Sequence, residues 1–110
     1  HLHAHGLSIP STDAAEAEAI AELLVEFPNV PVVAAKSLFG NLGAGSAAVE
    51  LICSLLALEH DQLFPIKNLE NPTPNARWET GKTGQSAGRA VVHSSFTLQG
   101  QASTIVVASV

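Results

Sequence analysis

The sequence predicts a layered α/β fold with a mixed β-sheet and a buried central helix. Short β-branched runs and helical patterns follow one another in the order β-α-β-α-β-β. The second helical pattern, residues 46–59, is apolar nearly all round, so no face of it is polar enough to meet water. We therefore expect this helix to be covered on both sides, with an apolar face left open only where part of a longer protein would pack.

The first half of the chain is predicted to form a strand, a helix and a second strand. Residues 1–5 alternate in hydrophobicity, and Asp13 with Glu16 has the spacing of a capping box at a helix start. Residues 14–27 form an amphipathic surface helix in which four apolar residues share one face, namely Ile20, Leu23, Leu24 and Phe27. After a proline, residues 30–35 form the second strand.

The second half is predicted to contain the central helix and two closing strands, with a segment between them, residues 62–68, that can form a further strand. A glycine-rich turn leads into the helix, where Glu50 is the single charge before the last residue and needs a partner. The remaining segments are, in order, the turn 40–45, the helix 46–59, a strand 62–68, a loop 69–88, and strands 89–96 and 103–110 joined by the hairpin turn 98–101.

Composition limits the classes of function. The 110 residues suffice for one compact domain, residues 1–110, and the net charge of −5 with no basic run argues against nucleic acid or an anionic membrane as a partner. The longest apolar stretch, residues 44–58, is too short and too interrupted to cross a bilayer. The single cysteine, Cys53, allows no intrachain disulfide, which fits a cytoplasmic protein. The chain lacks methionine and reads as a piece of a longer protein.

Four segments carry a resemblance to a known family. They are Ala4-His5-Gly6 with Asp13 and Glu16 downstream, Lys36-Ser37 with the helix start 42–50, the loop 68–72, and residues 95–100. In this order they resemble the N-A-H-G-T-S-T-P motif, the K-S-x-x-G-H motif, the N-L-D-N-P loop and the terminal N-S-F-G-F-G-G turn of β-ketoacyl synthases. The chain therefore looks like the C-terminal half of a thiolase-like condensing enzyme.

The resemblance implies a reaction and a missing group. Such enzymes join an acyl thioester on cysteine to malonyl on an acyl carrier protein by decarboxylative Claisen condensation, in fatty-acid or polyketide synthesis. The family's cysteine motif lies upstream of the matched region, so the isolated chain is expected to be inactive. Cys53 stands among leucines and an isoleucine and is expected to be a buried apolar residue instead.

Three residues are implied to be catalytic. His5 matches the histidine whose N–H stabilises negative charge on the thioester oxygen. Lys36 matches a lysine that supports the site electrostatically through hydrogen bonds. Asn41 stands where the family commonly has a second histidine, and its amide donates a hydrogen bond but does not titrate near neutral pH.

Four residues are implied to contact substrate. Leu7 and Ile9 replace two threonines whose hydroxyls contact the pantetheine arm in the family, so this chain has no hydroxyl to offer there. Phe96 belongs to the terminal motif, and Leu98 occupies the place of a gating aromatic within a turn that has lost glycines.

The same resemblance implies the partners. They are the acyl carrier protein and its acyl and malonyl thioesters, with phosphopantetheine carried by that protein and neither a resident cofactor nor a metal bound directly. The intact protein is expected to be a homodimer or a heterodimer.

Two alternatives stay open. Because His1, His3 and His5 alternate, a strand would point all three to one side, a spacing that can hold zinc. The departures at Asn41, Leu7 and Ile9 instead favour a non-catalytic ketosynthase-like partner subunit of the chain-length-factor type. The residue at the family's nucleophile position would separate an enzyme from such a subunit.

Overall fold

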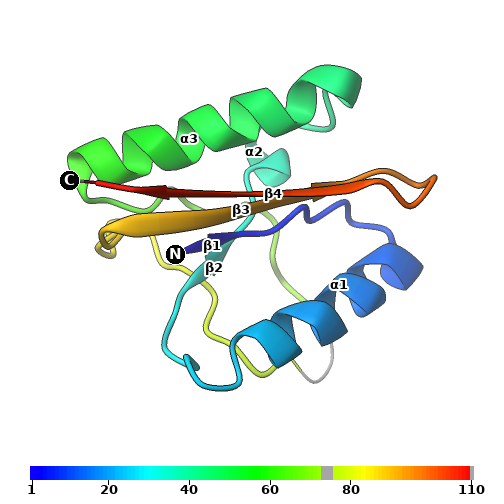
Figure 1. The fold of residues 1–110 in the computed structure, drawn as a ribbon, viewed down its shortest axis with the longest axis horizontal. Coiled ribbons are helices and arrows are strands. Elements are labelled where there is room, and N and C mark those ends of the chain that lie inside the picture. Colours follow the sequence, from blue (N-terminus) through cyan, green and yellow to red (C-terminus); the bar gives the residue numbers. More distant parts are fainter. Residues whose placement is uncertain (73–75, 110) are drawn as a thin grey trace.

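The computed structural model describes residues 1–72 and 76–109 and has three layers (Figure 1). A four-stranded sheet lies in the middle, helix α3 (Ser46–His60) covers one face, and helix α1 (Pro10–Leu23) covers the other (Figure 1). The predicted layered α/β fold and the order β-α-β-α-β-β are confirmed, with two short helical turns added before α3.

The sheet is mixed, as predicted. Its strand order is β2-β1-β3-β4, with β1 (Leu2–His3) parallel to β2 (Val32–Val33) and to β3 (Ala90–Phe96). Strand β4 (Ala102–Ala108) pairs antiparallel with β3 across the predicted hairpin turn, where Thr97 N–H donates to Gln101 O at 2.8 Å. The last residue of the strand predicted at 103–110 lies outside the described residues.

The predicted start of α1 is wrong. The helix begins at Pro10 with Ile9 as its N-cap, and no side chain caps it, because the side chain of isoleucine has no hydrogen-bond acceptor. Pro10 has no N–H and is favoured at the first position of a helix. The carboxylate of Glu16 reaches back to the β1–α1 loop instead of closing a capping box. Of the predicted apolar face only Ile20 and Leu24 are buried, whereas Leu23 and Phe27 are exposed.

Two loop segments also differ from expectation. The strand predicted at 62–68 is absent from the described residues: Leu63 is held by Gln85 and Gly84 main chain, and Pro65 cannot donate to a ladder. Helix α2 (Lys36–Phe39) and a 3₁₀ turn (Gly43–Gly45) replace a plain turn before α3. Within the predicted loop 69–88, residues 73–75 lie outside the described residues.

Helix α3 has the predicted bounds to within one residue, but it is covered on one side and not on both. The sequence allowed for an open apolar face where part of a longer protein would pack. The sheet covers one face, and that face carries Ser46, Glu50, Ser54 and Ala57. The opposite face is apolar and open, with Ile52 53% and Leu56 48% exposed. The helix thus turns its polar side inward, which is the reverse of an ordinary surface helix.

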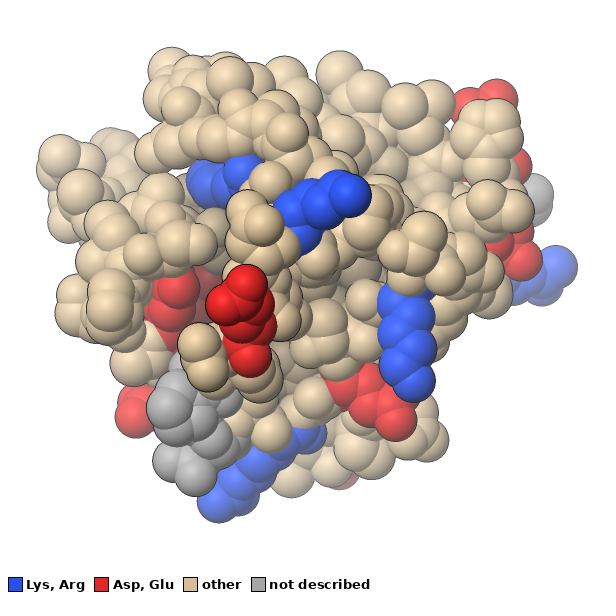
Figure 2. All heavy atoms as spheres, turned by 180° about the vertical axis from the view of Figure 1, so that it is seen from behind, with Lys and Arg blue, Asp and Glu red and all other residues tan. Residues whose placement is uncertain are grey.

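Two apolar clusters connect the layers. One apolar cluster joins α1 to the sheet, and a second lies between α3 and the loop at Leu63. On the face seen in Figure 2, acidic and basic side chains are interspersed among uncharged ones. No helix within residues 1–72 and 76–109 is long and apolar enough to span a bilayer.

Candidate active site at the start of helix α3

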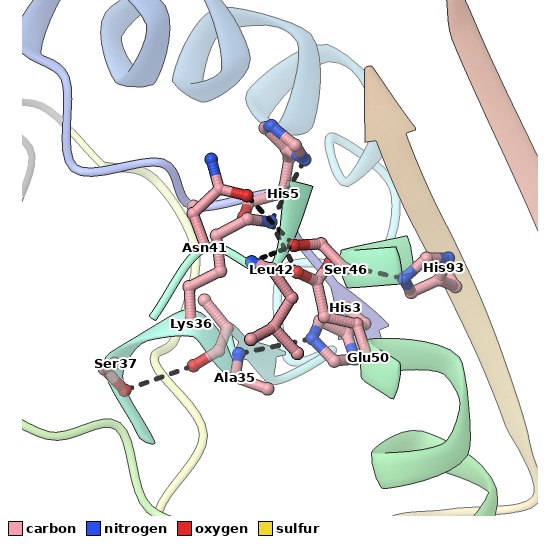
Figure 3. Close-up of polar contacts among 12 residues, drawn as sticks. His3, His5, Ala35, Lys36, Ser37, Asn41, Leu42, Ser46, Glu50 and His93 are labelled. Atoms are coloured by element: carbon pink, nitrogen blue, oxygen red, sulfur yellow. Dashed lines mark hydrogen bonds and ion pairs between the residues drawn. The ribbon is translucent and has the colours of Figure 1, made fainter. Parts of the chain in front are cut away.

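A buried polar seam fills the space between α3 and the sheet. Its members are the polar residues that the described structure buries: His1, His3, His5, Lys36, Ser46, Glu50, Ser54 and His93. Strand alternation puts the three histidines of the β1 segment on the side of α3, as predicted, while Leu2 and Ala4 join the apolar cluster on the side of α1. Figure 3 shows the part of the seam around His5 and Glu50.

Lys36 fixes the tautomer of His5. Its ammonium, which can only donate, lies 3.2 Å from Nδ1 of His5 and 2.6 Å from the carbonyl oxygen of the same residue. Nδ1 must therefore accept, and the proton of the neutral ring sits on Nε2. Burial first, and then the charge of Lys36, lower the pKa of His5 below its usual range, so the ring stays neutral near neutral pH.

Glu50 completes the shell around Lys36. The Lys36 Nζ atom lies 2.5 Å from Oε1 of Glu50, so each of its three N–H donors faces an acceptor. Burial alone would raise the pKa of Glu50, but His93 and Lys36 together outweigh it and hold the pKa below the usual range. The sequence indicated that Glu50 needs a partner; it did not indicate that this partner is the predicted site lysine.

The amide of Asn41 is oriented by its neighbours. Its Oδ1 accepts from Gly43 N–H and from Ser46 Oγ–H, each at 3.0 Å. Ser46 Oγ in turn accepts from Leu42 N–H at 2.7 Å. Because the carbonyl is occupied, the NH₂ group is the side of Asn41 that can donate to a bound molecule.

A cavity of about 310 Å³ brings most of the predicted site residues together. Its lining includes His5, Leu7, Asn41, Phe96 and Leu98. The ring of Phe96 lies 4.3 Å from that of His5, centroid to centroid, and Leu98 is 75% exposed at the rim. Ile9 does not line this cavity, since it is the N-cap of α1, and Lys36 lies behind His5.

Glu16 and Gly6 shape the loop that presents His5. The Glu16 carboxylate accepts from the N–H groups of His5 and Gly6 at 2.6 and 2.9 Å, although burial raises the pKa of this acid. Gly6 has φ +53°, and a Cβ there would stand 2.7 Å from that of Ala34. Only glycine allows this approach, which explains the residue that follows His5.

The other two histidines of the alternating set are engaged in hydrogen bonds. Ala35 N–H donates to Nε2 of His3, so the proton of His3 is on Nδ1, 2.7 Å from Ser54 Oγ. Ser54 also contacts His1 Nε2 at 3.1 Å. Burial chiefly lowers the pKa of His3 to about 3. The three histidines that point to the side of α3 are thus engaged in a hydrogen-bonded network. Among the described residues, no group of three potential ligands could hold a metal ion.

Cys53 is half-buried, not fully buried as predicted. It lies on α3 and contributes to a different cavity, beside Leu38 and His60. Burial, and then the charge of Glu50, raise the pKa of its thiol, so it is a poor nucleophile.

Comparison with known proteins identifies the family. A family model described as the β-ketoacyl synthase C-terminal domain matches residues 1–70. The chain belongs to the β-ketoacyl synthase family. It is 37% identical over 75 residues to 3-oxoacyl-(acyl-carrier-protein) synthase 2 of Synechocystis, covering 67% of this chain and 18% of that protein.

Polyketide-related proteins are similar as well. The tetracenomycin polyketide synthase ketoacyl synthase β subunit of Streptomyces glaucescens is 36% identical over 73 residues, which are 66% of this chain and 18% of that protein. The solved structure of the ishigamide ketosynthase/chain length factor superposes with a TM-score of 0.89 at 23% identity, over 99% of this chain and 27% of that one. The chain thus has the ketosynthase fold and spans less than a fifth of the length of these two curated relatives.

Proposed function

We propose that this chain is the C-terminal part of a β-ketoacyl-acyl-carrier-protein synthase that condenses an acyl thioester with malonyl on its carrier. His5, Asn41 and Lys36 are the catalytic and supporting residues. The polypeptide works in fatty-acid or polyketide synthesis in the cytoplasm, as a homodimer or heterodimer.

The observation that carries the proposal is the tautomer of His5. With Nδ1 engaged by Lys36, the ring offers Nε2–H as a fixed donor, and Asn41 offers its NH₂ group beside the same cavity. Two neutral donors in a partly enclosed site are suited to stabilise a thioester oxygen as it becomes negative. A protonated histidine would be less suited, because it would also bind the malonyl carboxylate that has to leave.

The proposed chemistry needs such donors at one step. The bond between the malonyl carboxylate and the methylene carbon breaks, carbon dioxide leaves, and the electron pair forms an enolate with its charge on the thioester oxygen. The enolate carbon then attacks the acyl thioester carbonyl, the new carbon–carbon bond forms, and the cysteine thiolate departs. That cysteine is supplied by the rest of the polypeptide, since Cys53 does not line the cavity of His5 and the pKa of its thiol is raised.

Decarboxylation of malonyl-acyl carrier protein by the full-length protein tests the proposal. We expect His5→Ala to slow carbon dioxide release about a hundredfold or more, the usual loss for one oxyanion donor, about 2.7 to 4 kcal/mol. Asn41→His keeps a donor and is expected to be tolerated. His60→Ala, at the far end of α3 and exposed, is the matched control and leaves the rate unchanged.

An unchanged rate in His5→Ala contradicts the assignment. A wild-type protein that releases no carbon dioxide contradicts the proposed reaction as a whole.

A non-catalytic partner subunit is the second candidate. It is favoured by Asn41 in place of a titratable histidine and by Leu7 in the cavity wall, because the Leu7 side chain has no hydroxyl to offer a pantetheine arm. One similar protein is named a ketoacyl synthase β subunit, and one similar structure is named a ketosynthase/chain length factor. Reading the residue at the nucleophile position upstream decides: cysteine supports the enzyme, and any other residue supports the partner.

A further inference from the structure

Glu50 has two oxygens and only one of them is used by Lys36. Oε1 faces the ammonium at 2.5 Å, and Oε2 faces the Nε2 atom of His93 at 3.6 Å. The carboxylate is fully buried, so an oxygen left without a partner would carry a large desolvation cost. Among the described residues His93 is the group that Oε2 faces.

The side chain of His93 also has few possible partners. Its side chain is buried on β3, directly across from His3 on β1, and its Nε2 has no hydrogen-bond partner among the described residues. The two imidazole rings meet edge to face, with centroids 5.1 Å apart at 83°. This packing leaves Nε2 of His93 aimed at Glu50, as Figure 3 shows. Either the neutral Nε2–H form or the imidazolium can donate there.

We propose that His93 is a positioning residue that holds Oε2 of Glu50 and, through Glu50 and Lys36, keeps His5 in its Nε2–H tautomer. The inference rests on the proposed function for its catalytic consequence, but the tautomer is a property of the site itself. The chain of contacts runs from His93 on β3 to Glu50 on α3, Lys36 on α2 and then His5.

The charges around Glu50 predict how its pKa changes when His93 is removed. The charged and titratable groups that face Glu50 are Lys36 from α2, His93 from β3, and His3 and His5 from the β1 segment, with Cys53 on its own helix. Burial raises the pKa of Glu50, and contacts with His93 and Lys36 lower it further than burial raises it. Without His93 the pKa of Glu50 therefore rises. Protonated Glu50 no longer anchors the ammonium, so the active form is lost at a higher pH than in wild type.

The first experiment needs no variant. Nitrogen-15 NMR of histidine-labelled full-length protein reads which ring nitrogen carries the proton. We expect His5 with the proton on Nε2 and not on Nδ1, and His93 with a proton on Nε2, at about pH 8, where an imidazole with a lowered pKa is neutral. A His93 whose Nε2 lacks a proton at that pH overturns the proposal.

The second experiment compares two replacements. His93→Leu fills the buried space with an apolar side chain and removes the N–H donor. His93→Gln keeps an N–H near the position of Nε2. We expect His93→Leu to shift part of His5 to the Nδ1–H tautomer, to lower kcat for decarboxylation about tenfold with little change in KM, and to move the acid limb of the rate profile to higher pH. His93→Gln is expected to stay within about twofold of wild type in kcat.

The outcomes separate the two proposals. A folded His93→Leu protein with wild-type His5 signals and an unmoved acid limb makes His93 a packing residue only. If His93→Leu does not fold, the wild-type spectrum and His93→Gln still decide. If wild type does not decarboxylate, the proposed function fails, and the nitrogen signals alone support or overturn the positioning role.

Discussion

The two faces of the sheet differ in kind although one short segment supplies both. On the side of α1, Leu2 and Ala4 pack with Ile20, Leu24 and Val32 in an apolar cluster. On the side of α3, the alternate residues of the same segment are histidines that meet Ser54 and Lys36. Apolar burial thus anchors the β1 segment on one face, so the other face can hold buried polar groups that would be costly by themselves.

The largest expected effect comes from breaking the ion pair on the polar face. Glu50→Leu leaves the ammonium of Lys36 buried without its carboxylate, and we expect about 3–5 kcal/mol less free energy of unfolding. Urea unfolding measures it. Glu59→Leu, exposed near the end of the same helix, is the control and should change the value by about 0.5 kcal/mol or less. A loss below 1 kcal/mol, roughly, for Glu50→Leu would mean that Lys36 finds water or another acceptor.

The apolar face should respond almost as strongly and without any pH dependence. Leu2 is 2% exposed, and Leu2→Ala is expected to lower the free energy of unfolding by about 3 kcal/mol through lost burial and a cavity. The loss should be equal at about pH 5 and about pH 8, because no titratable group takes part. A loss that grows as pH falls would show that the cluster and the polar seam are coupled, which breaks the contrast between the two faces.

The polar face should make stability depend on pH through His3. The pKa of His3 is lowered from 6.5 to about 3, so between these values the unfolded chain binds a proton that the folded chain does not. Stability is therefore full above about pH 6.5 and falls as pH falls, by about 2 kcal/mol at pH 5. His3→Gln should remove this part of the acid sensitivity, whereas His60→Gln at the exposed end of α3 should keep it. Equal acid sensitivity in all three proteins contradicts the assignment to His3.

Much of the fold was predictable because its signals are local. The hairpin between β3 and β4, the bounds of α3 and the one-sided alternation of the first histidines all follow from residues adjacent in sequence. The predicted capping box at Asp13 and Glu16 does not form, because the helix begins earlier, at Pro10, and the Glu16 carboxylate accepts hydrogen bonds from loop N–H groups instead. The predicted cover on both sides of α3 was not found, because apolar side chains favour burial but do not show which elements are present to bury them. Among the described residues the sheet covers one face of the helix, and the other face is exposed.

The motifs predicted most residues of the site but not the contacts that hold them. His5, Asn41, Leu7, Phe96 and Leu98 line one cavity although they are distant in sequence, but nothing in Ile9 showed that it would be a helix cap outside it. Glu50 was recognisable as a charge in need of a partner. His93 gave no signal, because its importance depends on a register across the sheet that a single sequence does not reveal.

The smallest effect is expected on the open face of α3, where Ile52 is 53% exposed. Ile52→Ser removes an apolar side chain that is already about half in water, so we expect a loss of about 1 kcal/mol or less in the free energy of unfolding. Urea unfolding at two protein concentrations measures it, with Leu2→Ala as the buried comparison. The physical reason is that burial stabilises in proportion to the apolar area removed from water, and only about half of Ile52 is removed. A loss near that of Leu2→Ala that grows with protein concentration would mean that copies of the chain cover this face, since Ile52, Leu55 and Leu56 form an apolar patch there.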